Sequence, residues 1–314
     1  MLFSVIVPLY NKRPHVSRFV SSVLAQTYTN FELIVVDDCS SDGSLEELDS
    51  FTDSRLKVYR REAPGPGGYA ARNLGISESR GKYIAFLDAD DEWFPDHLHK
   101  MHFLSENFPD AGFLASGYER CNDKINQCFN NYYMLFKQLG AHETDFHGFL
   151  LAYIKYERFC HTSVVVVKRE LFEEVGGFPA GATRKGGDLY TWLKLTKATK
   201  LAWSPHIGAR VYHNAVNQVT KTEYFNPDFI YNFVRNLGDG VSQNDRYLLK
   251  CYVNGLLYRD YLRGCALEGR RKFSLVEYTH YVSFPHFLRN VFIGLISPKL
   301  IQFARNWRHR NAKK

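Results

Sequence analysis

Short apolar runs and amphipathic stretches alternate along the first 120 residues of this chain. Almost continuous apolar character is typical of strands that are buried on both faces of a parallel sheet. It predicts strands over Leu2–Val7, Phe31–Val36, Leu56–Tyr59, Tyr83–Leu87 and Ala111–Tyr118. Helical spacing and capping residues predict helices that open at Pro14, that run through Glu46–Leu48, and that span Tyr69–Ser79 and Pro95–Asn107. Strand–helix alternation of this kind predicts an α/β fold with a doubly wound sheet.

The pattern becomes irregular and rich in aromatic residues between about 120 and 160. A strand over Ser163–Val167, a short helix over Glu170–Val175, a turn at Gly176–Pro179 and a helix over Asp188–Ala198 are then predicted. Beyond about residue 220, Tyr, Leu and Arg recur at helical intervals. We therefore expect a mainly helical C-terminal extension.

Ligands of doubly wound sheets bind beyond the carboxyl ends of the strands. Three segments follow a predicted strand directly, and they are Pro8–Asn11, Asp37–Ser41 and Asp88–Asp91. Asp37 and Asp38 are suited to accept hydrogen bonds from a ribose or a base. Tyr10 is suited to stack on a base, and Asn11 to cap the helix that follows.

Three carboxylates lie within four residues in the segment Asp88-Ala89-Asp90-Asp91. Mutually repelling carboxylates at a strand end favour a bound cation, and Mg²⁺ or Mn²⁺ sites commonly combine one or two carboxylates with substrate phosphates. The alternative is a solvated acidic turn in which Asp91 caps the next helix. Both interpretations remain open on spacing alone.

Four segments, in this order, resemble the motifs of family 2 glycosyltransferases: SVIVPLYN (4–11), VDDCSSDGS (36–44), ARNLG (71–75) and GKYIAFLDADD (81–91). The later segments GGFP (176–179) and GGDLYTWLKL (186–195) also resemble the family. The resemblance covers about residues 1–215. It implies a GT-A fold, which is a Rossmann-like, doubly wound mixed sheet.

The resemblance also implies a nucleotide-sugar site. Tyr10 would stack on the base, Asp38 would accept a hydrogen bond from it, and Arg72 would approach the base or the diphosphate. Asp88 would bind the ribose or the sugar, and Asp90 would bind Mn²⁺ or Mg²⁺. Pro8, Asn11 and Ala89 lie inside the same motifs and are assigned to this site.

Asp188 matches the catalytic base of the family, and the predicted helix places its carboxylate near N-terminal amides. The family usually has an acidic residue just before the base, where this chain has Gly187. We assign Gly187 and His161 to the acceptor side. His213 follows the base by 25 residues and is assigned to the metal or the diphosphate, although a lone histidine is more often structural.

The formal net charge of +7 comes from the end of the chain. Residues 285–314 carry seven Lys and Arg and no Asp or Glu, so residues 1–284 are neutral. A neutral body argues against nucleic acid as a partner. Apolar residues flanked by Arg and Lys over 285–314 predict a helix at an anionic membrane surface. The alternative is a helix packed on the protein, followed by a solvated basic tail.

These observations predict a catalytic domain over 1–218, with a nucleotide-sugar half (1–120) and an acceptor half (121–218), and a helical region over 219–314. The six cysteines show no paired spacing, the N-terminus does not resemble a signal peptide, and no apolar stretch is long enough to span a bilayer. We therefore expect a cytoplasmic enzyme that is peripheral on the inner face of the membrane.

The predicted activity is inverting, metal-dependent transfer of a hexosyl or N-acetylhexosaminyl group. The donor would be a nucleotide-diphosphate sugar, in the first place a UDP-sugar, and the acceptor a hydroxyl of a glycan or lipid-linked glycan in bacterial surface polysaccharide synthesis. One alternative is transfer to a polyprenyl phosphate carrier, which needs no base. Another is a non-catalytic basic protein that binds membrane or nucleic acid.

Overall fold

The computed structural model describes residues 2–122, 125–129, 131–156, 159–213, 215–216, 223–280 and 282–311. The chain divides into two compact units. The first contains residues 1–183 and 187–222, and the second contains residues 184–186 and 223–314. The second unit therefore includes the three residues that precede Gly187.

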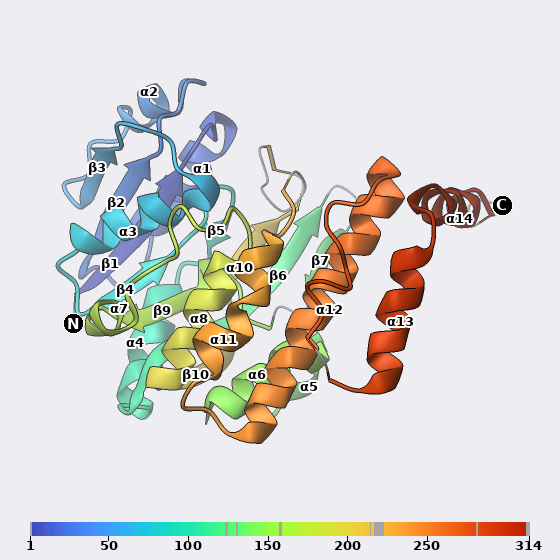
Figure 1. Ribbon diagram of the computed structural model, residues 1–314. Helices are drawn as coiled ribbons and strands as arrows, with labels where there is room; N and C mark the ends of the chain where they lie inside the picture. Colours follow the sequence, from blue (N-terminus) through green and yellow to red (C-terminus); the bar gives the residue numbers. More distant parts are fainter. Residues whose placement is uncertain are drawn as a thin grey trace. The chain divides into compact units, whose positions relative to one another are not determined.

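The first unit is built on one mixed sheet with the strand order β3-β2-β1-β4-β9-β6-β10-β5, in which β7 also pairs with β6 and β8 with β10 (Figure 1). The strands are β1 (Phe3–Leu9), β2 (Phe31–Asp37), β3 (Leu56–Arg60), β4 (Tyr83–Phe86), β5 (Glu92–Trp93), β6 (Ala111–Asn122), β7 (Ile125–Phe129), β8 (His142–Thr144), β9 (Val165–Lys168) and β10 (Lys200–Tyr212). Strands β3, β2, β1 and β4 are parallel, whereas β9 runs antiparallel to both β4 and β6. This arrangement confirms the predicted Rossmann-like mixed sheet.

Helices connect these strands and cover the sheet. They are α1 (Arg13–Leu24), α2 (Ser44–Leu48), α3 (Tyr69–Ser77), α4 (His97–Asn107), α5 (Asn131–Phe136), α6 (Phe146–Tyr156), α7 (Glu170–Val175) and α8 (Gly187–Ala198), with 3₁₀ turns η1 (Pro66–Gly68) and η2 (Thr162–Val164). The central strand β1 explains the layering, because its side chains alternate between the two faces. Val5 and Val7 pack in one core with residues of α1 and α4. Ile6 points to the opposite face, where it packs against α3. The contact is so close that a Cβ on Gly75 of α3 would come within 2.5 Å of the Ile6 side chain.

The strands and helices predicted over the first 120 residues are confirmed, and their ends agree within two or three residues in most cases. The largest difference is β6, which continues to Asn122. The predicted strand over Ser163–Val167 begins instead as the turn η2, and β9 starts at Val165. The sequence analysis did not find β10. Its apolar pattern is interrupted by Ser204-Pro205-His206, and its register with β6 shifts between Ser204 and Ile207.

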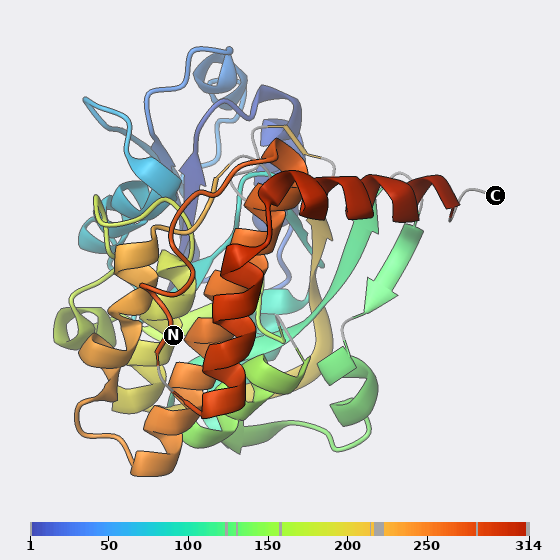
Figure 2. The same ribbon diagram turned by 45° about the vertical axis from the view of Figure 1, so that its right-hand side comes forward.

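The second unit is helical, as predicted beyond about residue 220. It contains α10 (Pro227–Tyr231), α11 (Phe233–Gly238), α12 (Gln243–Glu268), α13 (Phe284–Leu295) and α14 (Pro298–Asn311). Figure 2 shows α13 running along α12 and α14 leaving α13 at a steep angle. Within the described residues, no helix has both the length and the apolar character that crossing a bilayer requires.

Candidate functional site

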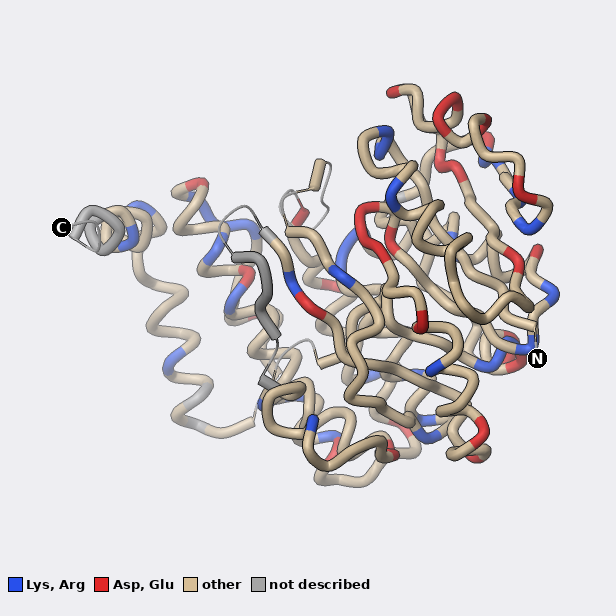
Figure 3. Tube along the Cα trace, turned by 180° about the vertical axis from the view of Figure 1, so that it is seen from behind, with Lys and Arg blue, Asp and Glu red and all other residues tan. Residues whose placement is uncertain are grey.

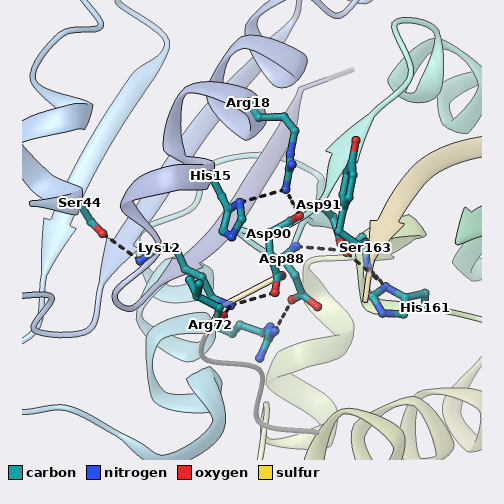
Figure 4. A network of polar contacts seen from close by, with 12 residues as sticks. Lys12, His15, Arg18, Ser44, Arg72, Asp88, Asp90, Asp91, His161 and Ser163 are labelled. Carbon is teal, nitrogen blue, oxygen red and sulfur yellow. Dashed lines mark hydrogen bonds and ion pairs between the residues drawn. The ribbon is translucent and has the colours of Figure 1, made fainter. Parts of the chain in front are cut away.

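The residues that follow β1, β2 and β4 lie at one edge of the sheet, where the carboxyl ends of these parallel strands meet. Figure 4 shows the polar network at this edge. The Asp88–Asp91 loop follows β4, and Lys12 leads into α1. His161 and Ser163 come from the segment around η2. The network therefore joins parts of the chain that are distant in sequence.

Asp88 and Arg72, both predicted to contact the donor, form an ion pair with an N···O distance of 2.5 Å. The Arg72 side chain is nearly buried, and one of its other nitrogens donates to the carbonyl of Gly67 at 3.2 Å. Burial by itself would raise the pKa of Asp88, but Arg72, with His161, holds this pKa below its usual value. Asp88 is therefore ionised at neutral pH and presents its negative charge beside a guanidinium.

Asp91 does not cap a helix on a solvated turn, so that alternative is wrong. Only 1% of Asp91 is exposed, and the residue before α4 is Asp96. The Asp91 carboxylate accepts hydrogen bonds from the Ser163 hydroxyl at 2.5 Å and from the Tyr212 backbone N–H at 3.0 Å. Burial raises the pKa of Asp91 well above its usual value, and the charges of Asp90 and Asp88 raise it further.

Among the described residues, a group that could hold a metal ion consists of Asp88, Asp91 and His161, whose ligand atoms lie within 4.8 Å of one another. His161 Nδ1 lies 3.7 Å from the Asp91 carboxylate and accepts a hydrogen bond from the Ser163 N–H. Carboxylate oxygens suit Mg²⁺ and Mn²⁺, so the chemistry of this set fits the predicted cation. His161, predicted to be on the acceptor side, lies beside the acidic loop.

Asp90, the predicted metal ligand, is paired with a residue that the sequence analysis missed. The Lys12 ammonium lies 2.9 Å from the Asp90 carboxylate and also donates to the carbonyl of Val216 at 2.5 Å. Arg18, also missed, donates to the Asp90 backbone carbonyl at 2.5 Å. Lys12 is the residue before α1 and Arg18 lies within this helix, and the hydrophobic pattern marked both positions only as polar. Together with Arg72, they bring three cationic groups to the acidic loop.

His213, also predicted at the metal, lies just after the end of β10. Its backbone N–H donates to the carbonyl of Cys121 at 3.0 Å. It is not part of the group formed by Asp88, Asp91 and His161. Its role toward a metal stays a prediction.

The predicted base-binding residues lie at the ends of β1 and β2. Tyr10 is 47% exposed, so its ring is accessible for stacking. Asp38 is buried, pairs with Arg61 and accepts from the backbone N–H of Gly65 at 3.1 Å. The Asp38 carboxylate thereby holds the loop before α3 in place. Its contact with a base stays a prediction.

Asn11 does not cap α1, so this part of the sequence interpretation is wrong. The residue before α1 is Lys12, and it makes no side-chain capping bond. Asn11 has a left-handed backbone (φ 49°), and its side-chain oxygen accepts from the Ser41 N–H at 2.8 Å. It therefore ties the loop after β1 to the loop after β2, where the donor is expected.

Pro8 and Ala89 complete the predicted donor residues. Pro8 pairs with Val36 in the register of β1 and β2, and a Cβ on Gly68 would lie 3.5 Å from it. Ala89 is buried between Asp88 and Asp90. Both residues shape the backbone at the strand ends.

Two of the sequence motifs are joined by a reciprocal pair of hydrogen bonds. The Asn73 side chain donates to the Phe178 carbonyl and accepts from the Phe178 N–H, both at 2.9 Å. Gly177 has a φ of +67°, and a Cβ there would lie 2.8 Å from the Asn73 oxygen. The GGFP turn is thereby fixed against α3, the helix that carries Arg72.

Asp188 lies in the first turn of α8, as predicted. Burial raises the pKa of the Tyr69 hydroxyl, and the nearby Asp188 carboxylate raises it further. Burial followed by Asp188 likewise raises the pKa of the Cys160 thiol. The backbone N–H of the preceding residue, Gly187, donates to the hydroxyl of Tyr69, the first residue of α3, so Asp188 lies close to the start of the helix that carries Arg72.

The structure gives a physical reason for glycine at position 187. The Gly187 N–H donates to the Tyr69 hydroxyl at 2.9 Å. A Cβ on Gly187 would come within 2.8 Å of the Tyr69 ring and 2.9 Å of Pro179. Tyr69 and Pro179 fill the space that a side chain at position 187 would need.

Residues 4–176 match the family described as Glycosyl transferase family 2, which is more than half of the chain. The chain belongs to this family. WfgD of Escherichia coli, named as a UDP-Glc:alpha-D-GlcNAc-diphosphoundecaprenol beta-1,3-glucosyltransferase, is 40% identical to this chain over 124 residues. That match covers 39% of this chain and 47% of WfgD. An uncharacterised glycosyltransferase of Haemophilus influenzae is 30% identical over 195 residues, or 62% of each chain. The matches thus span only part of the curated relatives, less than half in the case of WfgD.

Solved structures resemble the fold over almost the whole chain. Staphylococcus aureus TarS (residues 1–349), in complex with UDP-GlcNAc, has a TM-score of 0.75 at 16% identity and covers 98% of this chain and 92% of its own. The mannosyltransferase PcManGT of Pyrobaculum calidifontis, in complex with GDP-Man and Mn²⁺, has a TM-score of 0.55 at 16% identity and covers 96% and 86%. At these identities the likeness establishes the GT-A-like fold.

Proposed function

We propose that this protein transfers a hexosyl or N-acetylhexosaminyl group from a UDP-sugar to a hydroxyl of a lipid-linked glycan, with inversion at the anomeric carbon. The observation that carries the proposal is the pairing of Arg72 with Asp88 at the strand ends, with Asp188 near the same end of α3. The names of WfgD and of the TarS complex support a UDP-sugar donor. The name of WfgD supports a lipid-linked acceptor in surface polysaccharide synthesis.

In the proposed reaction, Asp188 accepts the proton of the acceptor hydroxyl as its oxygen attacks the anomeric carbon. The bond from this carbon to the diphosphate oxygen breaks on the opposite face, and the electron pair leaves with UDP. One attack from the opposite face inverts the configuration. Arg72 faces the diphosphate and stabilises the charge that develops on it.

The acidic loop would hold Mn²⁺ or Mg²⁺. Asp90 is the proposed ligand, and further donor atoms come from Asp88 and Asp91 of the same loop and from His161 beside it. When bound, the cation neutralises charge on the leaving diphosphate. The complex of PcManGT with GDP-Man and Mn²⁺ supports this proposal. We place the reaction at the inner face of the membrane, where a lipid-linked acceptor would be presented.

The test is a transfer assay with purified protein, UDP-glucose or UDP-GlcNAc, Mn²⁺ and a diphosphate-linked acceptor lipid. Asp188→Asn is expected to abolish transfer while UDP binding, measured by calorimetry, persists. Asp239→Asn, the same change at a 90% exposed position, is the matched control. Full transfer by Asp188→Asn would overturn the assignment of the base.

Two further measurements separate the alternatives. Mass spectrometry of the product distinguishes an extended glycan from a sugar attached directly to a polyprenyl phosphate. Removal of divalent cations by a chelator is expected to stop transfer, and transfer that continues unchanged would refute the role of Asp90.

A further inference from the structure

The helices α13 and α14 both pack against other parts of the second unit. Asn290 of α13 is fully buried and donates to the Thr279 hydroxyl at 3.0 Å. Ile293 of α13 and Ile301 of α14 pack on a cluster that includes Tyr261 of α12. The two helices are therefore part of this unit's packing rather than a free tail.

Both helices also expose large apolar side chains. These residues, here called the C-terminal apolar face, are between 47% and 76% exposed and comprise Leu288, Phe292 and Leu295 of α13 and Leu300 and Phe303 of α14. The first three are spaced by four and three residues, which places them on one side of α13. These five account for a third of the fifteen exposed large apolar side chains found among the described residues, within a span of only sixteen positions. Such clustering marks an interaction surface.

The charge around this face has a single sign. From Tyr278 to the C-terminus the sequence contains no Asp or Glu, and residues 285–314 carry seven Lys and Arg. Figure 3 colours Lys and Arg blue, and both α13 and the described part of α14 carry blue segments. Arg289 and Lys299 belong to these helices. Apolar side chains with a basic surround suit an anionic bilayer surface.

A cavity of about 370 Å³ extends the apolar surface at one end of α13. Leu295 belongs both to the face and to the cavity, and Val276 and Val291 line the cavity with it. Arg271 and Lys272 also line it. The cavity therefore combines apolar lining residues with basic groups, as the C-terminal apolar face does.

We propose that the C-terminal apolar face lies in the interface of an anionic lipid bilayer, with α13 and α14 in the plane of the membrane. This inference rests on the proposed function in one respect: binding to the bilayer would bring the enzyme to the membrane that holds the proposed lipid-linked acceptor. A second copy of the chain fits less well, because five side chains fall far short of the roughly 20–30 residues that each partner of a stable interface supplies. Two copies would also bring basic groups of like sign together.

The test is flotation of the full chain with vesicles of phosphatidylcholine containing 30% phosphatidylglycerol, and with pure phosphatidylcholine vesicles. Point substitutions are preferred to deletion of 285–314, because Asn290 and Ile293 belong to the packing of the unit. The variant is Phe292→Ser combined with Leu295→Ser. The matched control is Phe103→Ser on α4, an apolar side chain with a similar exposure of 62%.

Wild-type protein and Phe103→Ser are expected to bind the phosphatidylglycerol vesicles equally, and to bind more weakly in high salt or without phosphatidylglycerol. The double variant is expected to partition about a hundredfold more weakly, which corresponds to roughly 2.7 kcal/mol. Vesicle binding by the double variant equal to that of wild type overturns the proposal. A second result would also overturn the proposal. In it, wild type sediments as a dimer and the double variant as a monomer in sedimentation velocity, while the two proteins bind vesicles equally.

Failure of this proposal is distinguishable from failure of the proposed function. Transfer to a detergent-dispersed acceptor does not need the bilayer, so the double variant is expected to retain it at the wild-type rate. If neither protein transfers sugar, the proposed function fails whatever the vesicles show.

Discussion

Replacing Arg72 by methionine removes the guanidinium from Asp88 but keeps most of the side-chain volume. The Arg72 side chain is 9% exposed and that of Asp88 26%, and their charged atoms lie 2.5 Å apart. Loss of one partner of a buried ion pair costs about 3–5 kcal/mol, because the other charge stays desolvated. Asp88 keeps some access to solvent, so we expect about 3 kcal/mol at neutral pH, at the low end of this range.

The pH dependence follows from the lowered pKa of Asp88. A lowered pKa in the folded state stabilises the protein above the unfolded value of about 3.8, and this stabilisation is lost as the pH falls through the folded value. Without Arg72, Asp88 keeps only the weaker influence of His161 and Lys12 against its burial, so it takes up its proton at a higher pH than in the wild type. The difference in unfolding free energy between the two proteins should therefore be full at pH 7 and shrink as the pH falls toward 4.

The assay is urea unfolding at pH 7, 5 and 4, followed by tryptophan fluorescence. Three of the four tryptophans, at 93, 192 and 203, lie in the first unit with Arg72. The control is Arg169→Met, which removes an exposed pair with Glu173 at 3.6 Å and should cost about 0.5 kcal/mol or less. A cost for Arg72→Met that matches the control, or that does not change with pH, would refute the electrostatic reasoning.

The remaining predictions concern three positions. Gly187→Ala forces a Cβ against Tyr69, and overpacking of this kind costs about 1–3 kcal/mol; we expect a lower melting temperature and a fall in kcat larger than the loss of UDP affinity. Asp260→Ala leaves the Lys185 ammonium, now 3.2 Å from Asp260, without its buried partner, and should destabilise the second unit by about 3 kcal/mol in calorimetry. Ser163→Ala removes the hydroxyl that joins two carboxyl-bearing residues of the acidic loop, and should weaken Mn²⁺ binding in calorimetric titration with UDP present.

Each of these predictions has its own control. Gly181→Ala, where a Cβ meets nothing within 4 Å, tests the steric part of the first, although its left-handed backbone adds strain. Asp239→Ala, at a 90% exposed position, should leave the melting of the second unit unchanged. Ser163→Thr keeps the hydroxyl and should bind Mn²⁺ more tightly than Ser163→Ala. A prediction is contradicted if its variant and its control give the same value of the quantity measured, which is the melting temperature for Gly187→Ala and Asp260→Ala and the Mn²⁺ affinity for Ser163→Ala.

The sheet and the strand-end loops could be predicted because their signals are local. A strand such as β1 is buried on both faces, and six of its seven residues are apolar. The strand β10 escaped prediction because its pairing with β6 is irregular and Pro205 interrupts its pattern. Its existence depends on β6 and β5 lying on either side of it, which no local pattern records.

The same distinction applies to the site. Asp88, Asp90 and Asp188 were recognised as candidates because they lie at a strand end or a helix start within motifs. The partners of the acidic loop were not recognised, because Asp91 meets Ser163 and Tyr212 across 72 and 121 residues of sequence. The interpretation of Asp91 as an exposed helix cap failed for this reason.

The sequence by itself determined the α/β class, the strand–helix alternation of the first 120 residues, the positions of the carboxylates and the basic charge of the C-terminus. These follow from periodicity, from motif order and from counting. Only the tertiary structure decided which charges pair, why Gly187 has no room for a side chain, and which face of α13 is buried. Burial and pairing depend on neighbours that the chain brings together from far apart, and in a low-dielectric interior those neighbours set the energy of every charge.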